Sequence, residues 1–108
     1  MNSEIAKAII DESKRRGADP LDFATLVGYE TGGTFDVWKK GPTTKWGQHI
    51  GLIQMGEPQR KQFGYQPGIT PEQAVKASFD YLEANGWKPG MGILDMYSTI
   101  NAGRPGRY

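Results

Sequence analysis

Residues 26–35 read Leu-Val-Gly-Tyr-Glu-Thr-Gly-Gly-Thr-Phe, and this stretch sets a carboxylate near the end of an apolar helical pattern. The Gly32-Gly33 pair predicts the helix end, because glycine is favoured in the left-handed conformation that follows a helix. Glu30 stands just before that end, among apolar side chains that include Val27 and Phe35. Burial disfavours the charged form of a carboxyl group, so we expect the pKa of Glu30 to be raised. A carboxyl group that stays protonated can serve as a general acid, whereas a helix-end Glu that simply points to water has no such role.

Length and composition indicate one ordinary globular domain over residues 1–108. The chain has 37% hydrophobic and 23% charged residues, which is enough apolar material for a single core. Its net charge of +1 gives no signal for nucleic acid or for an anionic membrane. The chain has no cysteine, so disulfides and zinc-thiolate sites are excluded. Residues 1–7 lack a long apolar run, so we expect no signal peptide, and no window of the sequence approaches a membrane span.

Apolar periodicity and capping residues predict a mainly α fold with a long irregular or β-hairpin loop near residues 34–50. Ser3 and Asp19-Pro20 are typical helix starts, and Thr70-Pro71-Glu72-Gln73 is typical of a capping box. The predicted helices cover about residues 3–16, 20–31, 57–63, 70–85 and 92–100, with Gly17 and Gly64 as stops. The side chains expected to face inward are Ile5, Ile9, Ile10, Leu21, Ala24, Val27, Gly28, Val75, Phe79, Leu82, Ile93, Tyr97 and Ile100.

Three further motifs follow Glu30 along the chain. Gly51-Leu52-Ile53-Gln54-Met55 combines a glycine, which permits close backbone approach, with an amide that can donate to and accept from a sugar. Tyr81-Leu82 lies on the helix that begins at Thr70, and Ile100-Asn101-Ala102-Gly103 lies at a helix end. Taken alone, each has an ordinary explanation, since Gly-Leu-Ile occurs in many cores and a helix-terminal Asn is usually a cap. Because Gln54 and Asn101 are polar, we expect their loss to reduce activity with little loss of stability.

In this order and at these spacings, the motifs resemble the lytic transglycosylase domain of the lysozyme-like superfamily, in its soluble, goose-lysozyme-related branch. The resemblance covers about residues 20–108 and implies a small lysozyme-like helical domain. The family reads Glu-Ser-x-Phe, Gly-Leu-Met-Gln, a Pro-Glu-Gln helix start with Tyr-Leu, and Tyr-Asn-Ala-Gly. The short chain and its Asn-Ala-Gly-Arg-Pro-Gly-Arg ending are similar to versions in bacteriophage virion or lysis proteins. This likeness implies action on the bacterial cell wall or periplasm after delivery by a phage virion or lysis system.

The resemblance also implies roles for particular residues. Peptidoglycan is the implied substrate, and Glu30 is the implied catalytic acid and base. No metal or cofactor is implied, and no nucleic acid or membrane partner. The expected partner is a peptidoglycan glycan strand, and other virion proteins or a larger parent polypeptide remain open. The implied substrate-binding residues are Thr31, Gln54, Tyr81, Asn101 and Trp46, with Trp38 and Tyr65 as further candidates for stacking on sugars.

The chain departs from the family pattern at several positions. Thr31 stands where the family has Ser, and Ile53 stands where it has Met. Ile100 replaces a Tyr that in the family contacts the catalytic acid, so Tyr97, one helical turn earlier, is the candidate to replace it. The segment between Glu30 and Gln54 is longer than the family loop. Thr43 and Thr44 are therefore the candidates for the family's loop Ser.

The sequence also allows other functions to be compared with this one, beginning with hydrolysis. A lysozyme-type hydrolase would need a second carboxylate, for which Asp36, Glu57, Asp80 and Asp95 are candidates with ordinary surface explanations. His49 is the only histidine and is interpreted as a polar loop residue. Residues 14–20, between two predicted helices, resemble the turn of a helix-turn-helix motif. Residues 20–36 carry no Lys, Arg, Asn or Gln that could contact base edges, which excludes DNA recognition. A noncatalytic glycan-binding or virion structural module on the same fold stays open.

Overall fold

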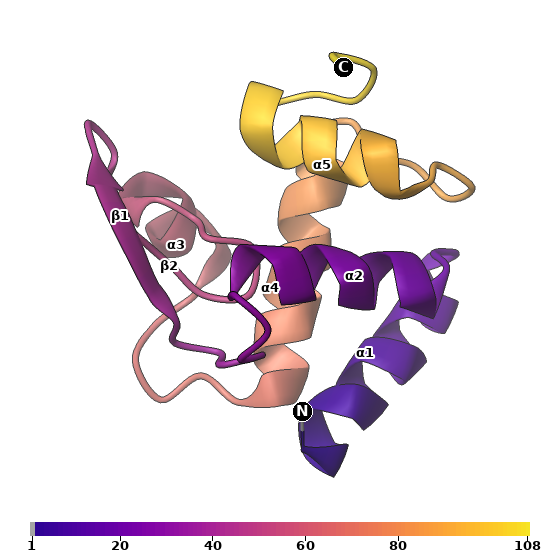
Figure 1. Ribbon diagram of the computed structural model, residues 1–108, viewed down its shortest axis with the longest axis horizontal. Helices are drawn as coiled ribbons and strands as arrows, with labels where there is room; N and C mark the ends of the chain where they lie inside the picture. Colours follow the sequence, from indigo (N-terminus) through magenta and orange to yellow (C-terminus); the bar gives the residue numbers. More distant parts are fainter. Residues whose placement is uncertain (1) are drawn as a thin grey trace.

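The computed structural model describes residues 2–108, which form a mainly α domain with one small antiparallel hairpin (Figure 1). The mainly α prediction is confirmed, and the hairpin lies within the segment predicted to be irregular or hairpin-like. Among these residues, no helix combines the length and apolarity needed to cross a membrane. The elements are α1 (Ser3–Arg16), α2 (Pro20–Glu30), β1 (Lys40–Thr44), β2 (Gly47–Ile50), α3 (Glu57–Phe63), α4 (Pro71–Ala84) and α5 (Ile93–Ala102).

The helix boundaries follow local capping chemistry. Asp19 accepts a hydrogen bond from the Leu21 backbone N–H at 2.9 Å, and Pro20 occupies the first turn. Thr70 and Gln73 form the predicted capping box, in which each side chain binds the other residue's backbone N–H. The cap of α1 differs from the prediction, because Asn2 rather than Ser3 accepts from the Ile5 backbone N–H, at 3.0 Å.

Helix α4 runs through the middle of the molecule and packs against α1, α3 and α5 (Figure 1). Its inner face carries Phe79, which stacks on Phe23 of α2 with ring centroids 4.4 Å apart and contacts Trp87 at 5.8 Å. These three rings are almost completely buried and join the helices in one apolar core. The hairpin and α3 lie to one side of this core, so a space remains between the hairpin and the ends of α2 and α5.

Some side chains expected in the core lie at the surface instead. Leu21 is 71% exposed, because the buried face of α2 carries Phe23, Leu26 and Val27 and the first turn of the helix turns Leu21 away from it. Ile10 of α1 is also exposed, and Tyr97 of α5 is 38% exposed. A helical period defines a face, but which face is covered depends on the neighbouring helices.

Candidate active site

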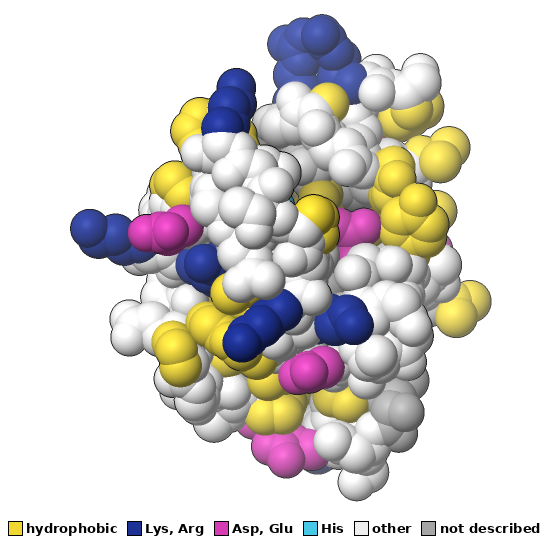
Figure 2. Space-filling view, turned by 60° about the vertical axis from the view of Figure 1, so that its left-hand side comes forward, with side chains coloured by type: hydrophobic (Ala, Val, Ile, Leu, Met, Phe, Trp, Pro, Cys, Tyr) yellow, Lys and Arg dark blue, Asp and Glu magenta, His cyan; other side chains and the backbone are white. Residues whose placement is uncertain are grey.

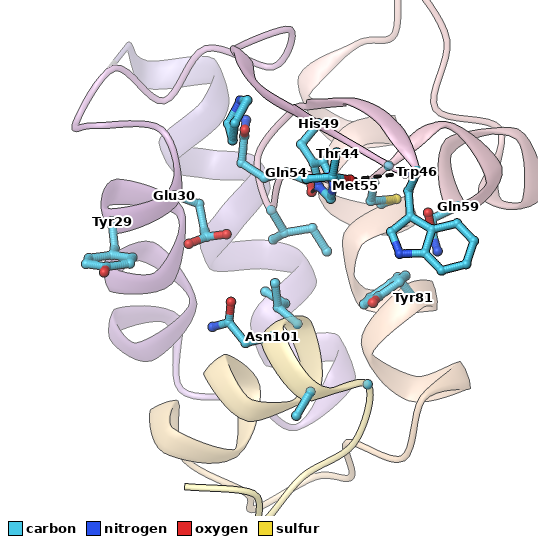
Figure 3. A pocket seen from close by; sticks show the side chains of 16 residues that line it. Tyr29, Glu30, Thr44, Trp46, His49, Gln54, Met55, Gln59, Tyr81 and Asn101 are labelled. Atoms are coloured by element: carbon cyan, nitrogen blue, oxygen red, sulfur yellow. Dashed lines mark hydrogen bonds between the residues drawn. The ribbon is translucent and has the colours of Figure 1, made fainter.

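A cleft of about 690 Å³ separates the hairpin from the C-terminal ends of α2 and α5. Five of the six residues predicted to act on substrate line it (Figure 3). These five are Glu30, Trp46, Gln54, Tyr81 and Asn101. These five side chains come from five separate elements or loops, and their positions span residues 30–101 of the chain.

The Lys and Arg side chains on the face of the molecule shown in Figure 2 are scattered, with no continuous basic surface there.

Glu30 is the last residue of α2, and its carboxyl group points into the cleft (Figure 3). The side chain is half-buried, and Ile53 and Ile100 line the same cleft. Desolvation raises the pKa of Glu30 above its ordinary value and is the only cause of the shift. The direction agrees with the expectation from the sequence, and the apolar lining supplies the physical reason. Such a carboxyl group keeps its proton to a higher pH than an exposed glutamate does.

Thr31 does not line the cleft and has no exposed surface. Its hydroxyl donates to the Val27 carbonyl at 2.8 Å and accepts from the Phe35 backbone N–H at 3.0 Å. Both bonds are internal, so this geometry does not support direct substrate contact by Thr31. The hydroxyl instead closes the end of α2 and turns the following chain, in which Gly32 and Gly33 both have positive φ. Thr31 thus helps to hold Glu30 in place from behind.

Gln54 lines the cleft, but its amide group is bound to the protein. The Nε2 atom donates to the Lys39 carbonyl at 2.9 Å and to the Gly51 carbonyl at 3.0 Å. The backbone of Gln54 has φ of 59°, a left-handed conformation that is costly for a residue with a side chain. The structure therefore gives Gln54 a role that its sequence position did not predict, which is to hold the loop before β1 against the turn after β2.

Tyr65 and Trp38 pack against each other and do not line the cleft. Tyr65 is buried, and its hydroxyl accepts from the Leu52 backbone N–H at 3.0 Å and donates to the Val37 carbonyl at 2.6 Å. Trp38 stacks on the Tyr65 ring with centroids 6.1 Å apart. Among the three stacking candidates, only Trp46 lines the cleft, where it is 49% exposed and the Lys45 ammonium lies 5.0 Å from its ring centroid.

His49 and Thr44 also line the cleft. The Nδ1 atom of His49 lies 2.7 Å from the Gln54 carbonyl oxygen, and its Nε2 atom lies 2.8 Å from the Thr44 hydroxyl. A carbonyl can only accept, so Nδ1 of His49 carries a hydrogen and donates it to the Gln54 carbonyl. His49 lies on β2 and not in an irregular loop, which corrects that part of the interpretation from the sequence. Its position in the cleft had no sequence signal, because it depends on the pairing of β1 with β2.

Tyr81 and Asn101 complete the wall opposite the hairpin. Tyr81 of α4 is half-buried, and burial raises the pKa of its hydroxyl. Its ring packs edge-to-face with Phe63, with ring centroids 5.8 Å apart. Asn101 is exposed near the end of α5, where its amide donates to the Tyr97 carbonyl at 3.2 Å. The Tyr97 hydroxyl donates to the Tyr29 hydroxyl at 3.3 Å and not to Glu30.

The four other candidate carboxylates lie outside the cleft. Asp36 is exposed and accepts from the Trp38 backbone N–H at 2.9 Å, and Asp95 accepts from the Gly106 backbone N–H at 3.0 Å. Asp80 forms ion pairs with Arg16 at 2.9 Å and Lys76 at 3.0 Å. Glu57 is exposed in the first turn of α3. Within residues 2–108, Glu30 is the only Asp or Glu that lines the cleft.

The arrangement offers one desolvated acid, several uncharged polar groups and an exposed aromatic ring in one cleft. Over the described part of the chain, no cluster of three or more His, Cys, Asp or Glu is placed to hold a metal ion. The cleft therefore brings one half-buried carboxyl group together with amide, hydroxyl and indole groups. Comparisons with protein-family models, with curated proteins and with solved structures find no match for this chain.

Proposed function

We propose that this protein is a peptidoglycan lytic transglycosylase in which Glu30 is the single catalytic acid and base. The observation that carries the proposal is that Glu30, with its raised pKa, is the only carboxylate of residues 2–108 in the cleft. The bond to be cleaved is the β-1,4 bond between N-acetylmuramic acid and N-acetylglucosamine. The resemblance of the four ordered motifs implies this substrate, and each of the four motifs contributes at least one residue to the lining of the cleft.

The reaction needs only one carboxyl group from the protein. Protonated Glu30 gives its proton to the glycosidic oxygen as the bond from that oxygen to C1 of the muramic acid breaks. The C1 centre takes on oxocarbenium character, and the muramic acid's own C6 hydroxyl oxygen forms a new bond to C1. The Glu30 carboxylate then takes the proton of that hydroxyl and is restored. No water is consumed, and the product carries a 1,6-anhydro ring.

The remaining cleft residues would bind and orient the strand. Asn101 and Tyr81 present an amide and a hydroxyl at the wall opposite the hairpin, where N-acetyl groups need both donors and acceptors. Trp46 offers an exposed ring at the hairpin turn for packing against a sugar face. Gln54 would act by holding the turn that supplies Ile53 and Met55 to the cleft, because its Nε2 is already bound to two carbonyls.

A hydrolase on the same scaffold is the second candidate. A retaining glycosidase holds its two carboxyl groups about 5–5.5 Å apart, and an inverting one about 6.5–9.5 Å apart. Asp36, the nearest candidate in sequence, lies outside the cleft, and this favours the transglycosylase.

A noncatalytic glycan-binding or virion structural module is the third candidate. Delivery by a phage virion or lysis system, alone or within a larger polypeptide, belongs to the proposal and rests on the resemblance.

Mass spectrometry of peptidoglycan digested with the purified chain tests the reaction type. We expect muropeptides that end in 1,6-anhydro-N-acetylmuramic acid and no new reducing ends. Asp36→Asn serves as the control, and we expect it to keep its activity because Asp36 lies outside the cleft. Products heavier by one water, made by the parent chain and lost in Asp36→Asn, would instead identify a hydrolase. Absence of any product with intact folding would favour the noncatalytic module.

A further inference from the structure

Two exposed tyrosines meet at the edge of the cleft, one from each of the helices that end there. Tyr29 of α2 is 68% exposed and Tyr97 of α5 is 38% exposed. Their ring centroids lie 5.4 Å apart at an interplanar angle of 71°, and their hydroxyl groups lie 3.3 Å apart. The pair therefore forms an exposed aromatic surface with two hydroxyl groups, defined here as the tyrosine platform.

Core packing does not account for the platform. Neither ring belongs to the buried core, whose members from α2 and α5 include Phe23, Leu26 and Met96. A hydrogen bond between two exposed hydroxyls stabilises a fold only slightly, since water competes for both groups. Sequence periodicity predicted Tyr97 to be buried, but the packing of α5 against α2 leaves it outside. The platform also does not coincide with the family's tyrosine, because Ile100 occupies that motif position.

The platform is continuous with the cleft. Tyr29 is itself a lining residue and immediately precedes Glu30 in the chain. In Figure 3, Tyr29 lies on one side of Glu30, whereas Trp46 and Tyr81 lie on the other. An extended ligand that passes Glu30 from the Trp46 side would reach Tyr29 next. Exposed aromatic rings thus stand on both sides of the single acid.

We propose that the tyrosine platform binds a pyranose ring of the same glycan strand, on the side of Glu30 away from Trp46. A pyranose has an apolar face of C–H groups and a rim of hydroxyls. A tyrosine offers the matching chemistry, with an apolar ring and a hydroxyl that donates and accepts. This proposal rests on the proposed function and adds to it that the substrate is held on both sides of the bond to be cleaved. Oligosaccharides that are too short to reach Tyr29 lack this contribution.

Binding of N-acetylglucosamine oligomers, from the dimer to the hexamer, to the full chain carrying Glu30→Gln tests the platform without requiring cleavage. Isothermal titration calorimetry measures Kd with and without Tyr29→Ala. We expect unchanged Kd for the shortest oligomers and roughly 10-fold weaker binding of the longest, the size expected for one lost aromatic contact. Tyr29→Phe keeps the ring and should retain most of the binding. Tyr108→Ala removes another exposed tyrosine, which does not line the cleft, and should have no effect.

Two results would overturn the proposal that the tyrosine platform binds a sugar ring. One is equal affinity of the parent and Tyr29→Ala for every oligomer length. The other is an equal loss at all lengths together with a lower melting temperature, which would show that Tyr29 supports the fold. The proposed function is judged separately, by muralytic activity of the chain that retains Glu30. If that chain is inactive while Tyr29→Ala weakens binding of only the longer oligomers, the proposed sugar binding by the platform is retained and only the enzymatic assignment fails.

Discussion

The side-chain amide of Gln54 lies directly against the backbone of Gly41, where a Cβ atom would overlap Gln54 Oε1. Gly41 belongs to β1, in the part of the hairpin where the pairing register shifts between Lys40 and Thr43. The absence of a side chain at Gly41 therefore permits the two hydrogen bonds that Gln54 makes to Lys39 and Gly51. This contact joins the hairpin to the turn that carries Gln54.

Gly41→Ala should destabilise the fold by about 1–3 kcal/mol, because the new methyl group forces the Gln54 amide aside. The effect should be much smaller in a Gln54→Ala background, where the next contact is the His49 carbonyl oxygen at 3.3 Å. Urea unfolding of the parent, both single variants and the double variant measures the coupling free energy. Additive free energies of unfolding would contradict the contact between the two residues.

Gln54→Ala should reduce both stability and activity, with a loss of about 1–3 kcal/mol for the two side-chain hydrogen bonds, since the Lys39 and Gly51 carbonyls keep only their backbone donors. This revises the expectation from the sequence, in which the loss of Gln54 reduces activity with little loss of stability. Gln54→Gly is the matched variant, since glycine adopts the positive φ of 59° without strain and should be about 1 kcal/mol more stable than alanine there. Melting temperatures of the parent and the two variants test this order of stability, with the parent highest and Gln54→Ala lowest.

Asn101→Ala should reduce muralytic activity with little change in melting temperature. Its amide makes one exposed hydrogen bond to the Tyr97 carbonyl, which water can replace. Activity per folded molecule is the quantity to measure. A lower melting temperature with unchanged activity per folded molecule would mean that Asn101 is only a helix-end residue.

Glu30→Gln should abolish muralytic activity, by about 100-fold or more, while the circular dichroism spectrum stays unchanged. The substitution keeps the shape of the side chain and removes the transferable proton. Thr31 and the two glycines that end α2 are unaffected, so the helix end should persist. A folded variant that kept most of its activity would show that Glu30 is not the acid.

The raised pKa of Glu30 also predicts how activity and stability depend on pH. Activity needs the protonated form, so the alkaline limb of the kcat/KM profile should lie above the ordinary carboxyl range. Between the ordinary pKa and the raised one, the folded state binds more protons than the unfolded state. The free energy of unfolding contributed by Glu30 therefore falls as pH rises through that window. Glu30→Gln should lack this loss and be more stable than the parent above the window, but not below it.

Much of the fold follows from local sequence chemistry. Asp19, Thr70 and Gln73 bind their own helix starts, and Gly17 and Gly64 adopt the left-handed conformation at helix ends. These interactions span only a few residues, so spacing along the chain suffices to predict them. The same reasoning located Glu30 at the end of α2, and the desolvation expected from its apolar neighbours has the direction that the structure shows.

Tertiary structure decided which motif residues share the cleft and what each side chain does there. Thr31 turned inward to close α2, Gln54 bound the carbonyl of Lys39, and Tyr97 faced outward to meet Tyr29. Each of these outcomes depends on a partner supplied by a turn, a distant loop or another helix, which periodicity does not specify. Sequence alone determined the helices and the position of the acid, because caps and apolar spacing act locally. The cleft and its tyrosine platform required the packing of α2, α5 and the hairpin around one core, because burial is a property of the assembled chain.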